Sequence, residues 1–341
     1  MANKILEVKN LETSFFTHVG EVKAVRDVSF SLNEGEILGI VGESGSGKSV
    51  TSMSIMRLLA ESGKIKNGEI LFKGQDLVKL SEKELRKIRG DKITMIFQDP
   101  MTSLNPLYSI GDQIEEIILE HKKISKSEAR ERTIEMLELV GIPGARERVN
   151  YYPSEFSGGM RQRVMIAMAL ACEPDLLIAD EPTTALDVTI QAQVLRLIKN
   201  LNAELNTATI LITHDLGVVA STCQNVLVMY GGQIMEMGSD EDIFYRPRHP
   251  YTMGLLKSVP RVRTDEKERL SPIQGSTPDM LNPPSGCPFY PRCDYAMNIC
   301  KLEEPNYFEI NENHKAKCWL LHENAPQIPE YEAQKGGVKN V

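Results

Sequence analysis

One motif in this sequence has the residue types and spacing that phosphate binding needs. Residues 42–49 read Gly-Glu-Ser-Gly-Ser-Gly-Lys-Ser and follow the apolar run at 37–41. Glycines allow backbone angles that turn successive amide N–H groups inward, which makes an anion site at the start of the next helix. Lys48 can reach the outer phosphates, and Ser49 offers a hydroxyl to magnesium. This phosphate loop predicts binding of a nucleoside triphosphate; a chance Gly-rich turn is the weaker alternative.

A second motif is an apolar strand that ends in two carboxylates. Residues 176–179 are Leu-Leu-Ile-Ala, and Asp180 and Glu181 follow them. In a phosphate-loop fold the strand-end aspartate, here Asp180, holds magnesium, usually through water. Glu181 then points toward the γ-phosphate, where it can accept a proton from an attacking water. Two solvated acids are the alternative, which the phosphate loop in the same chain makes improbable.

Composition excludes several classes of protein. The 341 residues are 41% hydrophobic and 25% charged with a net charge of −8, which is typical of a globular protein. A chain of this length forms roughly two domains. The basic residues near 83–92 and 261–269 are interleaved with acids, so no basic stripe predicts nucleic-acid binding. Without a membrane-spanning run or a signal peptide, we expect a cytosolic protein that reaches a membrane only through a partner.

Strand and helix patterns alternate through the first 250 residues. Strands are expected at 5–8, 22–25, 28–32, 37–41, 68–72, 93–97, 176–179, 208–212 and 225–229. Helices are expected at 110–120, 127–140 and 189–204, with Ser127 opening the second and Gly141 closing it. The alternation predicts a parallel sheet covered on both faces. Beyond residue 250 Pro, Gly and Cys become frequent, so we expect a boundary there and a loop-rich tail.

The six cysteines fall into two groups. Cys172 and Cys223 stand alone in apolar surroundings and are expected to be inert core thiols. The other four cluster in the last sixth of the chain: Cys287, Cys293, Cys300 and Cys318. In a cytosolic protein such a cluster indicates metal rather than disulfides. Its spacing matches neither a zinc finger nor the usual ferredoxin run, so zinc, an iron–sulfur cluster and free thiols all stay open.

A third motif lies between the first two. Residues 156–163 read Phe-Ser-Gly-Gly-Met-Arg-Gln-Arg. With this signature, residues 5–245 resemble the ATP-binding subunit of an ATP-binding-cassette (ABC) transporter, although Phe156 and Met160 replace a common leucine and glutamine. The resemblance implies an α/β phosphate-loop NTPase (RecA-like) core with an antiparallel β-subdomain and a helical subdomain at about 99–165. It assigns 1–250 to the nucleotide-binding domain and 251–341 to a small Cys-containing C-terminal module.

The resemblance also implies roles for single residues. Phe15 would stack on adenine, with Phe16 as a competing stacker. Gln98 would touch magnesium and the lytic water, and His214 would contact the γ-phosphate. Ser49, Gln98 and Asp180 would hold Mg²⁺, and catalysis would rest on Glu181, His214 and Gln98. The implied ATP contacts are Phe15, Gly42, Ser44, Gly45, Gly47, Lys48, Ser49, Val50, Ser157, Gly158, Gly159 and Asp187.

The signature opens a helix, so its hydroxyl and amides predict a second anion site. In the resembled family this site serves the nucleotide held by the other subunit, and Asp187 lies in a loop that crosses the dimer seam. ATP is then sandwiched between two subunits. The resemblance therefore implies a second homologous ATPase subunit as a heterodimer partner.

Three further segments, 99–106, 246–252 and 286–293, narrow the resemblance to the oligopeptide and dipeptide permease ATPases, a group that includes nickel importers. It implies ATP hydrolysis that energises peptide import, at the cytoplasmic face of the cell membrane. Two transmembrane permease subunits and an extracytoplasmic solute-binding protein are the other implied partners.

The long tail resembles the D-type ATPase subunit of such systems, which can carry a [4Fe–4S] cluster. The resemblance favours this cluster on Cys287, Cys293, Cys300 and Cys318 over zinc. We expect a structural role, separate from the nucleotide chemistry. The rival functions are an importer of nickel or another small solute, a soluble ABC ATPase, and a metal-binding regulator.

Overall fold

The computed structural model describes residues 3–97, 103–183, 187–258 and 273–334. The chain divides into two compact units, and each unit combines segments that are far apart in the sequence. The first unit contains Met1–Leu6, Ser31–Ile37 and Phe72–Ile212, and the second contains Glu7–Phe30, Leu38–Leu71 and Thr213–Val341. The expected domain boundary near residue 250 stays a prediction.

Three parallel strands form the sheet of the first unit. β7 (Leu176–Asp180) pairs with β6 (Ile93–Ile96) on one side and with β8 (Ala208–Ile212) on the other. Every residue of β7 and β8 is buried, as expected for parallel strands that are covered on both faces. Asp180 is therefore placed at the carboxyl end of the central strand of the three, the edge where parallel α/β sheets bind ligands.

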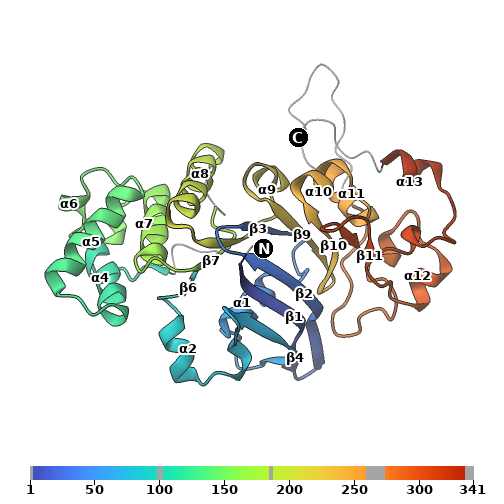
Figure 1. Cartoon of the computed structure of the whole chain (residues 1–341), viewed down its shortest axis with the longest axis horizontal. Coiled ribbons are helices and arrows are strands. Elements are labelled where there is room, and N and C mark those ends of the chain that lie inside the picture. The colour runs from blue at the N-terminus through green and yellow to red at the C-terminus, as the bar shows by residue number, and fades with distance from the viewer. Residues whose placement is uncertain (1–2, 98–102, 184–186, 259–272, 335–341) are drawn as a thin grey trace, which may run out of the picture. The chain divides into compact units, whose positions relative to one another are not determined.

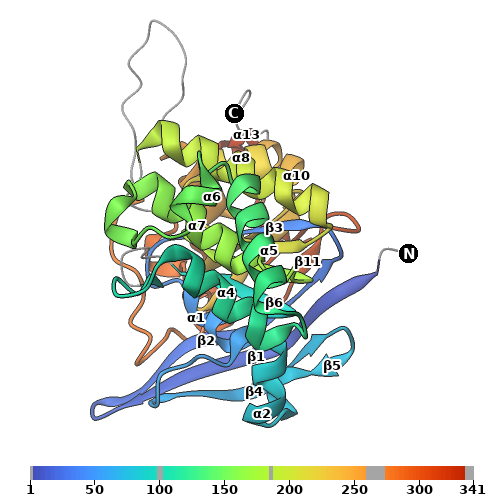
Figure 2. The same ribbon diagram turned by 90° about the vertical axis from the view of Figure 1, so that its left-hand side faces the viewer.

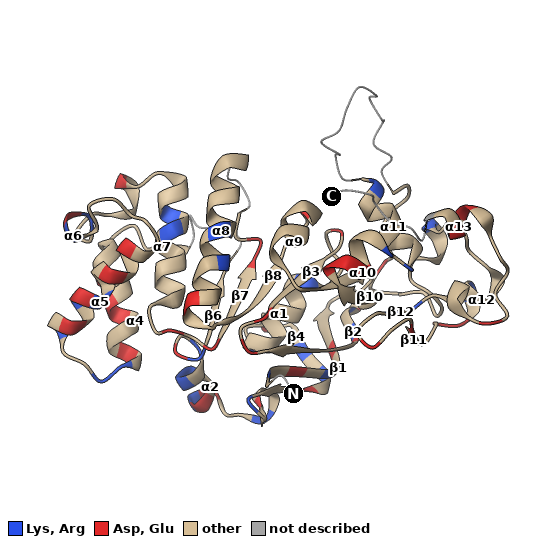
Figure 3. Ribbon diagram, turned by 45° about the horizontal axis from the view of Figure 1, so that its top comes forward, with Lys and Arg blue, Asp and Glu red and all other residues tan. Residues whose placement is uncertain are grey.

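The helices of the first unit include a closely packed group of α4 (Ile110–His121), α5 (Lys126–Leu139), α6 (Ala145–Arg148) and α7 (Gly158–Leu170) (Figure 1). Their shared core includes Ile114, Leu137 and Val164, and acidic residues lie along α4 and α5 (Figure 3). The remaining helices of this unit are α2 (Glu82–Ile88), α8 (Val188–Leu205), η1 (Leu77–Lys79) and η2 (Pro153–Glu155).

The start of α5 corrects one expectation. Ser125, rather than Ser127, is the N-cap, because its hydroxyl accepts the Glu128 N–H while the Glu128 carboxylate accepts the Ser125 N–H. This reciprocal capping box begins the helix at Lys126. The helix ends at Leu139, and Gly141 follows in a left-handed conformation with φ of 77°.

A strand layer of four members contains β1 (Lys4–Thr17), β2 (Gly20–Asn33), β4 (Gly63–Phe72) and β5 (Gln75–Asp76), in the order β2-β1-β4-β5 (Figure 2). The two-residue connection makes β1 and β2 an antiparallel hairpin. The two strands expected at 22–25 and 28–32 are one strand. Asp27 interrupts its pattern because it has φ of 49°, and its carboxylate accepts a 2.8 Å hydrogen bond from the Asn10 amide.

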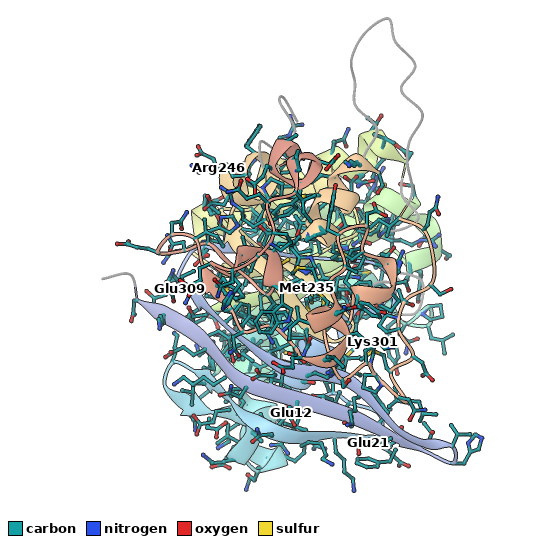
Figure 4. The ribbon with its side chains drawn as sticks, turned by 90° about the vertical axis from the view of Figure 1, so that its right-hand side faces the viewer. Glu12, Glu21, Met235, Arg246, Lys301 and Glu309 are labelled. Carbon is teal, nitrogen blue, oxygen red and sulfur yellow. The ribbon has the colours of Figure 1, made fainter. Side chains whose placement is uncertain are left out.

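The second unit also contains a mixed sheet that reaches into the tail. β3 (Ile37–Val41) pairs in parallel with β9 (Asn225–Tyr230), and β9 pairs antiparallel with β10 (Gln233–Ser239). β10 then pairs with β12 (Lys315–Ala316), which pairs with β11 (Phe308–Glu309). Figure 4 labels Met235 on β10 and Glu309 on β11. The tail therefore extends this sheet rather than forming loops alone.

The helices of the second unit are α1 (Lys48–Met56), α9 (Leu216–Thr222), α10 (Asp240–Tyr245), α11 (Pro250–Lys257), η3 (Tyr290–Arg292), α12 (Asn298–Leu302), η4 (Trp319–Leu321) and α13 (Pro329–Gln334). Within the described residues, no helix has the length and apolar character to cross a membrane. Cys172 and Cys223 are buried, at 1% and 5% exposure, as expected for core thiols.

Candidate nucleotide site and four-cysteine cluster

The phosphate loop joins β3 to α1, and its glycines have the conformations that the motif requires. Gly42, Gly45 and Gly47 have φ of 151°, 77° and 101°. A side chain at Gly42 would overlap the carbonyl oxygen of Met229, whereas one at Gly45 would meet nothing within 4 Å. Gly47 caps α1 without a side-chain hydrogen bond, and the first turn carries no acid. The loop and the helix N-terminus therefore fit an anion.

The side chain of Lys48 folds back over the phosphate loop. Its ammonium donates hydrogen bonds to the carbonyl oxygens of Gly42 and Glu43, at 2.8 and 2.9 Å. The side chain is buried, while Ser44, Gly45 and Ser49 are exposed and Val50 is half-buried. The exposed residues leave one side of the loop open to a ligand that carries the phosphates.

Glu181 follows β7 in a conformation that is uncommon for a side chain of its type. Its φ is 48°, and its N–H donates a 2.9 Å hydrogen bond to the carbonyl oxygen of Ile212. Asp180, directly before it, is only 4% exposed. A non-glycine residue held in the left-handed region is frequent at functional sites, because the surrounding structure fixes its direction.

The signature residues begin α7, as the sequence predicts. Ser157 is the N-cap, and its hydroxyl accepts a hydrogen bond from the Met160 N–H. Ser157 and Gly158 are exposed, and a Cβ at Gly158 would meet nothing within 4 Å. A Cβ at Gly159 would lie 2.8 Å from the Ile190 side chain, so glycine allows α7 to approach α8. The helix start is thus open to an anion, although Ser157 already uses its hydroxyl as a cap.

Asp187 and His214 each lie beside a helix start. The Asp187 carboxylate caps α8 by accepting a 3.0 Å hydrogen bond from the Ile190 N–H. His214 is exposed, which argues against a core histidine, and its neighbour Asp215 caps α9 through the N–H groups of residues 217 and 218. Gln98 lies outside the described residues, so its roles stay predictions.

The two candidate adenine stackers differ in exposure. Phe15 is half-buried and packs so closely on the start of β4 that a Cβ at Gly63 would lie 2.8 Å from its ring. Phe16 is 42% exposed, and the ammonium groups of Lys64 and Lys66 lie 5.7 and 5.4 Å from its ring centroid. Phe16 is the more accessible of the two, and the stacking role of Phe15 remains a prediction.

The predicted residues divide between the two units. The second unit contains Phe15, the phosphate loop, His214 and the four cysteines. The first unit contains the signature, Asp180, Glu181 and Asp187. Within each unit the structure brings neighbours together, namely the loop with α1, and the signature helix with the end of β7.

The four tail cysteines line one small cavity of about 20 Å³, together with residues that include Phe289, Tyr295 and Trp319. Burial raises the pKa of Cys287 and of Cys293 to about 12, and the pKa of Cys318 is also raised. Among the described residues, no three or more His, Cys, Asp and Glu side chains are arranged to hold a metal ion. Because their pKa is raised, Cys287, Cys293 and Cys318 are neutral thiols at neutral pH when no metal is bound.

The tail contacts the nucleotide loop, because Arg292 forms an ion pair with Glu43 of that loop at 2.5 Å. The expectation that the cysteine cluster is separate from the nucleotide chemistry stays a prediction. Tyr251 also contacts the loop, since its hydroxyl accepts a 2.8 Å hydrogen bond from the Glu43 N–H. Arg292 and Tyr251 both lie in segments that narrowed the resemblance, but nothing in those segments indicates Glu43 as their partner.

Comparison with known proteins agrees with this geometry. The ABC transporter family model matches residues 25–184, and the model of the oligopeptide/dipeptide transporter C-terminal region matches residues 235–300. The oligopeptide transport ATP-binding protein OppD of Bacillus subtilis is 57% identical over 339 residues, which cover 99% of this chain and 95% of the relative. The dipeptide transport ATP-binding protein DppD of the same species is 56% identical, over 94% of this chain and 96% of the relative.

Solved structures give the same family. The post-hydrolysis dimer of the ATP-binding cassette MJ0796, bound to ADP and Pi, is 30% identical with a TM-score of 0.62, over 69% of this chain and 98% of that chain. The phosphate loop, the strand-end carboxylates and the signature are all in place in the chain described here. The chain therefore belongs to the oligopeptide and dipeptide transport ATP-binding proteins of the ABC transporter family.

Proposed function

We propose that this chain hydrolyses ATP to energise the import of dipeptides or oligopeptides through a membrane transporter. The observation that carries the proposal is the match of nearly the whole chain, tail included, to relatives named for oligopeptide and dipeptide transport. The ATP-binding cassette MJ0796 covers only 69% of this chain. Import of nickel or another small solute is the second candidate, and a soluble ABC ATPase is the third.

Different residues of the chain would bind the phosphates, accept the proton and hold magnesium. The amides of the phosphate loop and the ammonium of Lys48 bind the phosphates. Glu181 accepts the proton of the attacking water, and His214 and Gln98 orient the water and the γ-phosphate. Ser49, Gln98 and Asp180 would hold Mg²⁺, which supplies positive charge to the phosphates when bound.

The proposed assembly follows from the open signature helix. Ser157 and Gly158 face solvent, so an ATP that is bound by another subunit can reach them. We propose a homologous ATPase subunit as that partner, in a pseudo-twofold heterodimer. Two transmembrane permease subunits and an extracytoplasmic solute-binding protein complete the transporter, with this chain peripheral at the cytoplasmic face of the membrane.

The tail is proposed to hold a [4Fe–4S] cluster on Cys287, Cys293, Cys300 and Cys318. The support is the type of donor, because four thiols line one cavity, although these described side chains are not arranged to hold a metal ion. His249 also lines the cavity, but its Nδ1 already accepts a hydrogen bond from the Tyr251 N–H. Thiolates suit iron–sulfur clusters and zinc alike, so zinc is the alternative.

Transport by the reconstituted complex tests the proposed function. Proteoliposomes with the two ATPase subunits, the permease subunits and the binding protein should accumulate labelled dipeptides or oligopeptides when MgATP is enclosed. The complex with Lys48→Ala should not, because the loop then lacks the cation that meets the phosphates. ATP-dependent uptake of nickel without uptake of peptides would favour the second candidate.

A further inference from the structure

One side chain of the tail, Arg292, joins the four-cysteine turn to the phosphate loop. Its guanidinium forms a two-pronged ion pair with the Glu43 carboxylate, at N–O distances of 2.5 and 3.0 Å. The other N–H groups donate to the Tyr230 hydroxyl at 3.1 Å and to the carbonyl oxygens of Ile273 and Gln274 at 3.0 and 2.8 Å. All five guanidinium donors are thus used, and the side chain is 5% exposed.

Glu43 is held at three points, one of which is the lysine of the phosphate loop. Its carboxylate binds Arg292, its N–H donates to the Tyr251 hydroxyl at 2.8 Å, and its carbonyl oxygen accepts a 2.9 Å hydrogen bond from Lys48. A shift of the Glu43 backbone therefore moves an acceptor of the ammonium that meets the phosphates.

Charge gives Arg292 a second effect on the loop. Glu43 is an acid inside a loop that receives a polyanion, and its side chain is 27% exposed. An unpaired carboxylate there would repel the phosphates, and the repulsion would be strong because the site is partly shielded from water. The bidentate guanidinium neutralises this carboxylate and fixes its direction.

We propose that Arg292 is a positioning residue for ATP binding, which acts through Glu43 on the phosphate loop. The turn that carries Cys287 and Cys293 is thereby coupled to the nucleotide site. Because such coupling is reciprocal, ATP binding also stabilises this turn. The inference rests on ATP binding by the chain, and it does not require a metal in the tail.

The affinity of the full-length chain for ATP tests the proposal. Isothermal titration with MgATP should show that Arg292→Ala weakens binding by about tenfold or more, the effect of losing a charged hydrogen-bonded pair. Arg292→Lys should restore little of the ATP affinity, because an ammonium cannot form the bidentate pair with the Glu43 carboxylate. The double variant Arg292→Ala/Glu43→Gln should recover most of the affinity, since the unpaired charge is then gone.

The matched control is Lys317→Gln. Lys317 is as buried as Arg292 and pairs at 3.0 Å with Glu304 of the same tail, so the pair includes no residue of the phosphate loop. The Lys317→Gln variant should change the ATP affinity by less than about twofold. In the assembled transporter, Arg292→Lys should raise KM for ATP while kcat is largely kept, a split that general destabilisation does not produce.

The coupling to the turn has its own readout. Hydrogen exchange at residues 287–293 should slow on MgATP binding in the wild type and not in Arg292→Lys. Should Arg292→Ala fail to fold, Arg292→Lys and Glu43→Gln supply the comparison. An unchanged affinity in Arg292→Lys, or an equal loss in Lys317→Gln, would overturn the proposal.

Discussion

Gln162, on the signature helix α7, donates a hydrogen bond from its side-chain amide to the carbonyl oxygen of Pro182, the residue after Glu181. Gln162 is 1% exposed, so water cannot easily replace this bond. The helix that begins at Ser157 and the segment that carries Glu181, the proposed catalytic base, are therefore tied together within one unit. A movement of the signature helix can therefore be transmitted to Glu181 through this hydrogen bond.

Replacing Gln162 with leucine should weaken both stability and catalysis. The change removes the donor of a buried carbonyl, which costs about 1–3 kcal/mol in the free energy of unfolding. Glu181 should also lose its fixed direction, so kcat should fall more than ATP affinity. Denaturant unfolding of the chain and ATPase assays of the assembled transporter measure the two effects.

Gln193→Leu is the control for Gln162→Leu. Gln193 lies on α8, where its side-chain oxygen accepts a 3.0 Å hydrogen bond from Arg163 of α7. This bond also joins α7 to a neighbour but does not reach the residues beside Glu181. Equal losses of kcat in both variants would contradict a specific role of the Gln162 bond.

Glu181→Gln should leave ATP binding intact and lower turnover by about 10²–10⁴-fold, because an amide cannot accept the proton of the attacking water. It should also trap the closed ATP sandwich of two ATPase subunits. Steady-state ATPase activity and size-exclusion chromatography with MgATP measure these effects. Glu204→Gln, an exposed change on α8, is the control, and wild-type hydrolysis by Glu181→Gln would remove Glu181 from catalysis.

The sequence predicts the chemistry of this chain better than its tertiary contacts. The phosphate loop and the β7 carboxylates are local motifs, because adjacent residues determine both their conformation and their ligand. The error at α5 is local as well, since Ser125 and Ser127 are both good caps and only the partner Glu128 decides between them.

Long-range pairing explains what the sequence does not predict. Arg292 and Glu43 are 249 positions apart, and the sequence around each residue does not indicate that the other is its partner. The pairing of β12 with β10 likewise joins a two-residue strand to a strand far away in the chain. Such contacts follow from the tertiary fold, which local propensity does not determine.

The isolated chain should hydrolyse ATP poorly, because each proposed site combines a phosphate loop with the signature residues of another subunit. Addition of the homologous ATPase subunit should raise the rate per chain steeply. ATPase activity measured over a range of protein concentrations, with the oligomeric state followed in parallel, tests this. A high rate in a strictly monomeric preparation would contradict the composite site.

The segment that follows Gln98 should dock against the membrane subunits. Leu107 and Tyr108, just before α4, are 80% and 56% exposed, which is unusual for large apolar side chains. Cysteines at these positions should form cross-links to a permease subunit, in a nucleotide-dependent way. Val19→Cys, 64% exposed between β1 and β2 and outside the docking stretch at about 110–140, is the control, and equal cross-linking from Val19 would indicate random collision.

The last prediction concerns the metal of the tail. Anaerobically purified chain should be brown and contain iron and acid-labile sulfide, and Cys293→Ser should lose both, because the thiolates are the proposed ligands. Cys172→Ser, which removes a buried thiol far from this turn in sequence, should keep both. Zinc without iron would favour the zinc alternative.

The protonation state of the cysteines distinguishes metal-bound thiolates from metal-free thiols. Burial raises the pKa of Cys287 and Cys293 to about 12 in the metal-free chain, so only about one thiol in 10⁴ is ionised at pH 8. Because the thiolate is the nucleophile, alkylation should be slow at pH 8 and should accelerate about tenfold per pH unit up to the pKa. A bound metal holds the sulfurs as thiolates at neutral pH, and its ligation releases protons. Addition of Zn²⁺, which brings no protons of its own from sulfide, should therefore release thiol protons from the metal-free chain in a weakly buffered solution. Zinc binding without proton release would leave the four residues as unligated thiols.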